Sequence, residues 1–335
     1  MIRGMPGSVA KALSNISFDL DTPSRLPEIE ALLNRTVLFG GKRFRPLLCL
    51  LFGHLLKLEL EKLAPFGRSA EFTHAASLAH DDVIDEADKR RNRPTINKIS
   101  SNARAVLAGD ILLARVMTEV SGQGSIEITQ DLSHVVRELV EGEWLQLEAR
   151  GRIDVTEAHL ERVASQKTAS LLAWCCQTPV RLCFPTRNPS TPQELALFEA
   201  AGRFGRSIGL AFQFVDDVLD FESTSEKPVA QDLREGLVNF VTFEMLRAHP
   251  ELKGGIRDIL MDPEPRAYPW TPQQLSDAQS RVRARAENKL ALAELALQEI
   301  QNILSSAESP SITGYNPEAL EPLRGAMEFL GARKK

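Results

Sequence analysis

The sequence lacks the features that define several large classes of protein. No stretch approaches the roughly 20 uninterrupted apolar residues of a membrane span, and residues 1–21 hold no apolar run long enough for a signal peptide. The four cysteines, Cys49, Cys175, Cys176 and Cys183, fit neither a zinc spacing nor a secreted disulfide framework. The formal net charge is −5, whereas nucleic-acid binding requires a basic face. We therefore expect a cytoplasmic protein with buried, reduced thiols, no membrane span and no nucleic-acid partner.

The period-two alternation typical of strands is also nearly absent, and the dominant period is helical. Apolar residues recur every three or four positions in segments such as RPLLCLLFGHLLKLEL, ARAVLAGDILLARVMTEV and VRARAENKLALAELALQEIQNIL. A hydrophobic content of 43% is ample for a large core, and no stretch has the composition of an interdomain linker. These patterns predict an all-α protein. We expect one domain over residues 1–335, a bundle of ten or more helices around a central cavity, with a loosely ordered segment at 1–24.

Acidic residues are concentrated in two motifs of identical spacing on separate apolar segments. HDDVIDEADKRR and FQFVDDVLDF each contain D-D-x-x-D, which comprises Asp81, Asp82 and Asp85 in the first case and Asp216, Asp217 and Asp220 in the second. On an α-helix, residues three and four apart lie on one face, so each triplet is expected to point its carboxylates to one side. Such stacked acids repel one another unless a cation or a solvated face compensates.

The apolar flanks decide between those two forms of compensation. Three acids on a helix that is apolar nearly all round would be costly to bury without a partner. Divalent cations are the natural partner, and all-oxygen ligands favour Mg²⁺, above all where phosphate supplies further oxygens. If the two helices face each other, six carboxylates converge on one cavity. The alternative is two unrelated solvated helix faces.

Basic residues near the acidic motifs supply the other half of a phosphate site. Arg90 and Arg91 follow the first triplet, GGKRFRP joins a flexible turn to three cations, and Lys167-Thr168 lies in an apolar segment. Lys227 follows the second triplet in a loop. Each residue alone fits an ordinary surface charge or a capping turn. Jointly they indicate a diphosphate ligand gripped through Mg²⁺ and directly by Lys and Arg.

These motifs resemble those of the trans-isoprenyl diphosphate (polyprenyl) synthases. HDDVIDEADKRR, FQFVDDVLDF, GGKRFRP and SQKTA occur in the family's order over about residues 35–245, and EGEWLQL at 141–147 also resembles a family segment. The resemblance implies the all-α isoprenoid-synthase fold and, usually, a homodimer. It also implies Mg²⁺-dependent, head-to-tail condensation of isopentenyl diphosphate with an allylic diphosphate.

The resemblance assigns a role to each matching position. It implies isopentenyl diphosphate contacts from Lys42, Arg45, His74 and Arg91. It implies the magnesium ligands Asp81, Asp85 and Asp216, with Asp82, Asp217 and Asp220 in support. It implies allylic diphosphate contacts from Arg90, Lys167, Thr168, Gln213 and Lys227. The six aspartates and Lys167 are therefore the candidate catalytic residues.

The sequence departs from the family pattern after the second triplet. Here it reads EKPVAQDLREGLVNF, with Glu226 and Ala230 where glycines are usual and Leu237 where a lysine is usual. That lysine normally helps to bind the allylic diphosphate, so we expect weaker allylic binding than in relatives that carry it. Arg234, one helical turn earlier, is a candidate substitute.

Small residues before the first triplet bear on product length. Ala76 and Ser77 lie one turn below Asp81, and Thr73 lies one turn deeper. In the family, aromatic residues at these positions stop chain growth early, so small ones predict a product longer than twenty carbons. Plain close helix packing would equally favour small residues. A farnesyl- or geranylgeranyl-length synthase, a terpene cyclase and a non-catalytic subunit of a heteromeric synthase are the competing interpretations.

Overall fold

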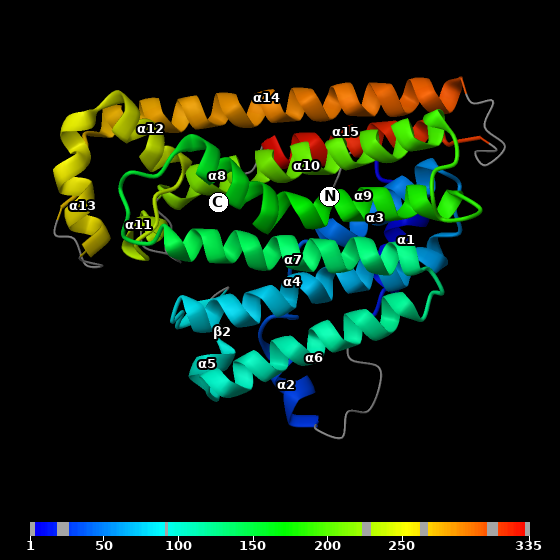
Figure 1. Cartoon of the computed structure of the whole chain (residues 1–335), viewed down its shortest axis with the longest axis horizontal. Coiled ribbons are helices and arrows are strands. Elements are labelled where there is room, and N and C mark those ends of the chain that lie inside the picture. Colours follow the sequence, from blue (N-terminus) through cyan, green and yellow to red (C-terminus); the bar gives the residue numbers. More distant parts are fainter. Residues whose placement is uncertain are drawn as a thin grey trace. The chain divides into compact units, whose positions relative to one another are not determined.

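The computed structural model describes residues 4–18, 27–90, 93–222, 229–261, 267–306 and 314–331. Within these ranges the regular structure is helical, apart from one antiparallel hairpin of two short strands, β1 (Lys89–Arg90) and β2 (Arg93–Pro94) (Figure 1). The predicted all-α class is confirmed. Among the described residues, no helix combines the length and hydropathy that crossing a membrane requires.

The chain divides into two compact units, and several long helices contribute residues to both. Unit 1 comprises Met1–Val136, Trp174–Ala201 and Ile300–Leu323, and unit 2 comprises Arg137–Ala173, Gly202–Glu299 and Arg324–Lys335. The helices shared between them are α7 (Ile126–Glu148), α9 (Ser170–Cys183), α10 (Pro192–Asp220), α14 (Pro272–Ser305) and α15 (Leu320–Gly331). The expectation of a single domain over 1–335 stays a prediction.

Unit 1 contains most of the N-terminal half of the chain. Its own elements are α1 (Gly7–Asn15), α2 (Pro27–Arg35), α3 (Phe44–Leu55), η1 (Leu60–Leu63), α4 (Ala64–Ile84), the β1–β2 hairpin, α5 (Ile96–Ile99), α6 (Asn102–Ser121) and η4 (Pro317–Ala319). The segment at 1–24, which we expected to be loosely ordered, contains the helix α1. Burial of Val9 packs this helix against the rest of unit 1. Residues 1–3 and 19–24 of that segment lie outside the described residues.

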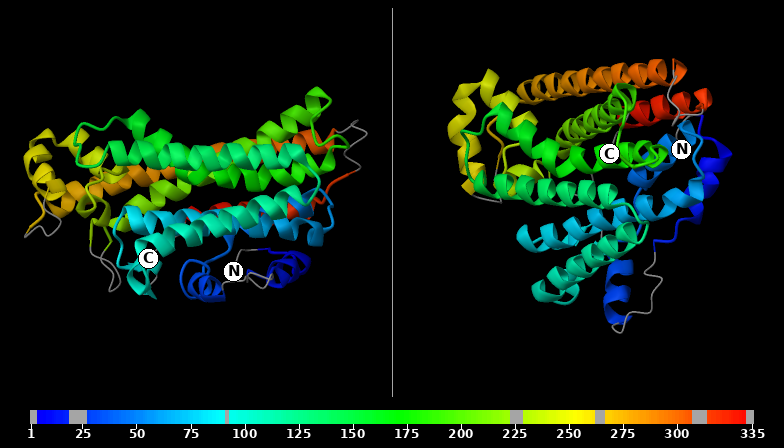
Figure 2. Two further views of the ribbon diagram at one scale, coloured as in Figure 1. Left: turned by 60° about the horizontal axis from the view of Figure 1, so that its bottom comes forward. Right: turned by 45° about the vertical axis from the view of Figure 1, so that its right-hand side comes forward.

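In unit 1, α4 and α6 lie side by side along most of their length (Figures 1 and 2). A glycine makes the approach possible near the first acidic motif. A Cβ atom on Gly109 of α6 would lie only 2.3 Å from Nε2 of His80 on α4. The residue immediately before Asp81 is therefore packed directly against the α6 backbone.

Unit 2 contains its share of the long helices together with α8 (Glu157–Ala164), η2 (Ser165–Ala169), α11 (Gln231–Arg234), α12 (Phe240–Ala248), η3 (Pro250–Leu252) and α13 (Lys253–Met261). Two glycines bring α10 close to η2 and the start of α9. A Cβ on Gly209 would lie 2.4 Å from Cα of Ala169, and one on Gly205 would lie 2.6 Å from Cα of Ala173. Because those atoms are backbone, α10 could not approach as closely with any larger residue.

Candidate active site

The first acidic motif occupies the C-terminal end of α4. Asp81 and Asp82 lie in its last turn, and Asp85 is the residue at which the helix ends, with its N–H donating to the Asp81 carbonyl at 2.8 Å. Asp81 and Asp85 are half-buried, whereas Asp82 is only 1% exposed. The expectation that all three carboxylates point to one side is wrong for Asp82, because a step of one residue turns the side chain by about 100°.

Asp82 holds Arg90 in an ion pair. Its Oδ1 accepts a hydrogen bond from Nε of Arg90 at 2.9 Å and lies 2.8 Å from Nη2 of the same guanidinium. Burial raises the pKa of Asp82, and the charge and hydrogen bonds of Arg90 act in the opposite direction. Arg90, expected to contact a diphosphate, is thus fixed within its own motif. This pairing was not predicted, since it depends on a hairpin that folds the chain back.

The β1–β2 hairpin presents Arg90 to α4. Lys89 pairs with Pro94 and Arg90 with Arg93. Side chains from the following segment secure it, because Thr95 Oγ1 donates to the Ala87 carbonyl at 2.6 Å. Two of the predicted substrate contacts, Arg91 and Lys227, lie outside the described residues.

The GGKRFRP segment forms a turn in which three residues around Lys42 have left-handed backbone conformations. Gly40, Gly41 and Arg43 have φ values of 68°, 94° and 49°. Arg43 stabilises this turn, because its guanidinium donates to Glu71 Oε1 at 2.9 Å and to the Leu38 carbonyl at 2.7 Å. Lys42 remains exposed at the turn.

Arg45 has a different environment from its neighbour. Its Nε is buried and donates no hydrogen bond to any described residue. Burial lowers the pKa of the Arg45 guanidinium, and the nearby Glu71 and Cys175 act in the opposite direction. An incompletely bonded guanidinium is suited to bind an anionic ligand. His74, the other predicted contact here, is half-buried on α4.

The residues predicted to govern chain length lie on α4, one and two turns before Asp81. Ala76 and Thr73 are buried and Ser77 is half-buried. The hydroxyl groups donate back to their own helix: Thr73 Oγ1 to the Ser69 carbonyl and Ser77 Oγ to the His74 carbonyl, each at 2.9 Å. Their outward surfaces are therefore small and largely apolar.

The second acidic motif ends α10 in unit 2. Asp216 is exposed and Asp220 half-buried, whereas Asp217 is 4% exposed. The predicted all-round burial of this segment is wrong, because Asp216 and Asp220 share an accessible face. Both oxygens of Asp220 accept backbone N–H groups, from Gln231 at 3.0 Å and Asp232 at 3.3 Å, so this carboxylate caps the short helix α11.

Asp217 is bonded into the core. Its Oδ1 accepts from Nε2 of Gln213 at 2.8 Å, and its Oδ2 accepts from the Phe240 N–H at 2.9 Å. Burial raises the pKa of Asp217 well above its usual range, and Asp232 acts in the same direction. In turn, Thr168 Oγ1 donates to Oε1 of Gln213 at 2.8 Å. Three residues predicted separately, Thr168, Gln213 and Asp217, are therefore one hydrogen-bonded chain.

Lys167 is partnered rather than isolated. It lies with Thr168 in η2, a π-helical turn, and its ammonium forms an ion pair with Glu143 of α7 and a hydrogen bond to Gln146 Oε1 at 3.2 Å. π-turns are rare and frequently occur at functional sites. Glu143 and Gln146 belong to the EGEWLQL segment, whose resemblance to a family segment did not predict this contact with Lys167.

The chemistry of the donor set fits a hard divalent cation. The accessible carboxylates of the two motifs are Asp81, Asp85, Asp216 and Asp220, and oxygen-only ligands favour Mg²⁺. Within the part of the chain that the structure describes, no three His, Cys, Asp or Glu side chains converge as a ready-made metal cage. Mg²⁺ is commonly bound by one or two carboxylates, waters and substrate phosphates, so the residues fit that mode of binding.

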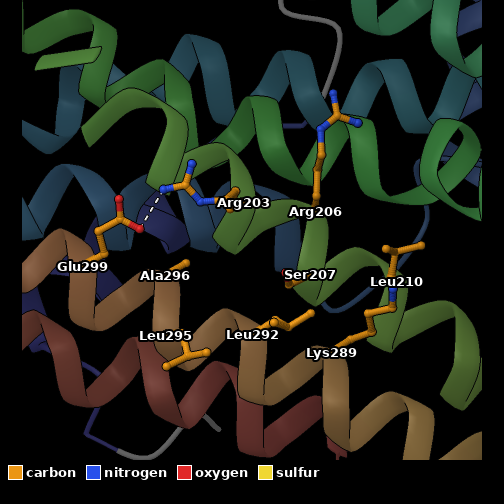
Figure 3. A pocket seen from close by; sticks show the side chains of 9 residues that line it. All are labelled: Arg203, Arg206, Ser207, Leu210, Lys289, Leu292, Leu295, Ala296 and Glu299. Atoms are coloured by element: carbon orange, nitrogen blue, oxygen red, sulfur yellow. Dashed lines mark hydrogen bonds and ion pairs between the residues drawn. The ribbon is translucent and has the colours of Figure 1, made fainter. Parts of the chain in front are cut away.

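A separate cavity of about 300 Å³ lies on unit 2 between α10 and α14 (Figure 3). It is mainly apolar, with Leu210, Leu292 and Leu295 in its lining, and an ion pair of 2.7 Å joins Arg203 to Glu299 at one end. None of the predicted site residues lines it. We therefore assign the candidate chemistry to the acidic motifs.

The chain belongs to the polyprenyl synthetase family, whose model matches residues 26–267. It is 40% identical over 220 residues to a prenyl transferase of Synechocystis, a match that covers 64% of this chain and 65% of that one. It is 36% identical over 200 residues to the octaprenyl diphosphate synthase of Escherichia coli, covering 59% of each. The matched region thus spans about three fifths of these curated relatives.

A solved structure agrees with the fold over nearly the whole chain. The polyprenyl synthase of Caulobacter crescentus, complexed with calcium and isoprenyl diphosphate, superposes with a TM-score of 0.74 and 23% identity. The match covers 98% of this chain and 95% of that chain. At this identity the likeness establishes the isoprenoid-synthase fold, as the motifs had indicated.

Proposed function

We propose that this protein is a magnesium-dependent prenyltransferase. It condenses isopentenyl diphosphate head-to-tail with an allylic diphosphate to give a trans-polyprenyl diphosphate. The observation that carries the proposal is that both acidic motifs have the same internal arrangement. In each, the middle acid, Asp82 or Asp217, is buried and bonded to its own unit, while the first acid, Asp81 or Asp216, stays accessible. A solvated helix face would not require that division.

Bound magnesium would neutralise the diphosphate and make it a better leaving group. We propose Asp81, Asp85 and Asp216 as its principal protein ligands. Asp82 and Asp220 support them, since the first holds Arg90 and the second caps α11. The calcium and isoprenyl diphosphate bound to the Caulobacter crescentus polyprenyl synthase support a site for a divalent cation and a diphosphate.

The basic residues would divide between the two substrates. Lys42, Arg45 and His74 in unit 1 would hold isopentenyl diphosphate, and the partly bonded guanidinium of Arg45 supports that role. Lys167 and Thr168 on the π-turn would hold the allylic diphosphate, together with Arg90. As the allylic C–O bond breaks, the isopentenyl double bond attacks the allylic carbon and a proton is then lost. The departing diphosphate would accept that proton.

We propose a product longer than twenty carbons. The octaprenyl name of the Escherichia coli relative supports a long chain, as do the small side chains at Thr73, Ala76 and Ser77. A phenylalanine at position 76 would fill the space needed by a growing tail. If that position were only a packing contact, the same substitution would overpack the core by about 1–3 kcal/mol.

Product analysis tests the reaction and the length together. Purified protein is incubated with labelled isopentenyl diphosphate, farnesyl diphosphate and Mg²⁺, and the products are separated by chain length. We expect a prenyl ladder beyond twenty carbons that chelation abolishes and Mg²⁺ restores. A cyclised hydrocarbon would contradict the proposal in favour of a terpene cyclase. Inactivity without a partner protein would contradict it in favour of a non-catalytic subunit.

The Ala76→Phe variant then tests the chain-length assignment. It should shorten the product, whereas Ala75→Phe, on the adjacent buried position that faces about 100° away, should not. Thermal unfolding of both variants controls for overpacking. A wild-type product of only fifteen or twenty carbons would overturn the assignment.

We also propose a cytoplasmic homodimer. All four cysteines are free, which supports a reducing compartment. Exposed large apolar side chains on α6 and α7, including Leu107 and Trp144, support an interface between copies.

A further inference from the structure

The lysine of the SQKTA motif is held by a neighbouring helix. The Lys167 side chain is 22% exposed and that of Glu143 is 12% exposed, so their ion pair is largely shielded from water. Gln146, one turn along α7 from Glu143, accepts a second bond from the same ammonium at 3.2 Å. These are the partners of Lys167 among the described residues. Shielded charge pairs are stronger than exposed ones, since water and salt screen them less.

A glycine allows α7 to reach the π-turn. A Cβ atom on Gly142 would lie 2.9 Å from Cβ of Gln166 and 2.9 Å from Cγ of Lys167. Any larger residue would push α7 away from the turn, and Glu143, the next residue, would move with it. The EGEWLQL segment thus combines a close approach with two acceptors for one ammonium.

The number of donors on the ammonium determines what remains for a ligand. A lysine ammonium has three N–H groups. Gln146 accepts a hydrogen bond from one of them, and the Glu143 carboxylate forms an ion pair with the ammonium from a second side, which leaves donor capacity for another acceptor. A lysine side chain is otherwise flexible, so two fixed partners remove most of the conformational freedom that binding would have to restrict.

The opposite side of the π-turn is also tied down. Thr168 donates to Gln213 of α10, which donates to Asp217 of the second acidic motif. The turn is therefore held by α7 through Lys167 and by α10 through Thr168. Both anchors end on side chains rather than on the backbone ladder of a regular helix.

We propose that Glu143 and Gln146 are positioning residues that orient the Lys167 ammonium so that its third N–H points to the diphosphate of the allylic substrate. The inference rests on the proposed function, because it assumes that Lys167 binds that diphosphate. Glu143 and Gln146 themselves need not touch the substrate. Their contribution is to reduce the entropy lost when Lys167 binds and to fix the direction of its bond.

Steady-state kinetics test the inference. Glu143→Ala should raise the KM for the allylic diphosphate about tenfold, the size of one charge-assisted hydrogen bond. Glu143→Gln retains an acceptor and should fall between Glu143→Ala and the wild type. The KM for isopentenyl diphosphate should not change, because its proposed contacts lie on other residues. Glu141→Gln, two positions earlier on α7 and bonded to Gln166 instead, is the matched control.

A double-mutant cycle separates positioning from general damage. In a Lys167→Met background, Glu143→Gln should have no further effect on the allylic KM, because its partner is gone. An equal loss in both backgrounds would overturn the proposal. An allylic KM that falls when Glu143 is neutralised would also overturn it, since the carboxylate would then compete with the substrate.

Lysine acylation distinguishes this inference from the proposed function. Peptide mass spectrometry measures the acylation rate of Lys167 relative to the exposed Lys253 in protein without substrate. We expect several-fold faster labelling of Lys167 in Glu143→Gln, because loss of the ion pair frees the amine. Unchanged labelling would overturn the positioning role whether or not the protein is active. Faster labelling with an unchanged KM would also overturn it, while leaving the prenyltransferase activity intact.

Discussion

Leu237 lies in the loop after α11, half-buried, with its backbone N–H donating to the Asp232 carbonyl at 2.7 Å. The resemblance to the polyprenyl synthases predicts a lysine at this position that would help to bind the allylic diphosphate. Leu237→Lys should therefore lower the allylic KM. A full charge-assisted hydrogen bond would strengthen binding of the allylic diphosphate by about 1.5–3 kcal/mol. Initial rates against allylic diphosphate concentration measure this.

Leu237→Met is the matched control for that change, because it keeps an uncharged side chain of similar volume. The two variants should differ only in allylic KM. An unchanged KM in Leu237→Lys would contradict the prediction. Arg234 is the candidate substitute for the lysine in the wild type. Arg234 has a long hydrogen bond of 3.4 Å from Nη2 to the Tyr268 hydroxyl, so it is not held strongly by that partner.

At the residue scale, the sequence identified the acidic positions but not how they divide. The spacing of Asp81 and Asp85 correctly indicated a shared side, because four residues complete about one helical turn. It could not reveal that Asp82 pairs with Arg90 or that Asp220 caps α11. Those bonds depend on a hairpin and a loop whose return paths are not encoded in any local period.

At the element scale, Gly209 sets the distance between α10 and the π-turn. Gly209→Ala would place a Cβ 2.4 Å from Cα of Ala169, so the helices must separate. We expect the free energy of unfolding to fall by about 1–3 kcal/mol. Chemical denaturation monitored by circular dichroism measures this change.

Gly254→Ala is the matched control in a helix. A Cβ at Gly254 of α13 meets no atom within 4 Å, so alanine adds helix propensity without a clash. We expect that variant to gain about 0.5–1 kcal/mol. Equal effects of the two substitutions would mean that α10 and the π-turn are not in close contact in solution.

The contact between α10 and the π-turn also shows which elements the sequence could predict. Apolar periodicity predicted the long helices, because a helix that buries one face needs apolar residues every three or four positions. It gave no signal for the π-turn at Ser165–Ala169, since one extra residue per turn barely alters a short pattern. The glycines at 205 and 209 were visible, but which backbone they approach depends on tertiary packing.

At the scale of the whole molecule, we expect two copies to associate. Leu107 is 56% exposed on α6 of unit 1, and Trp144 is 64% exposed on α7 within unit 2. Large apolar side chains left in water favour association. Light scattering should give twice the chain mass of 37.1 kDa, and Leu107→Arg should shift the population toward the single chain. A single-chain mass for the wild type would contradict the homodimer.

The overall class followed from sequence more readily than the site. Helical periods alone predicted the all-α fold, and several motifs in one order indicated the family to which the chain belongs. The division of acids between core and surface depends on individual side-chain contacts, which are set only when the packing is complete.

The ion pair between Asp82 and Arg90 also constrains how this protein can change over evolutionary time. A substitution of Arg90 alone would leave a carboxylate that is 1% exposed without its cation, which would destabilise the folded protein. Such a lineage would lose folding stability as well as the proposed diphosphate contact of Arg90. The two positions should therefore be inherited as a pair, retained together or replaced together.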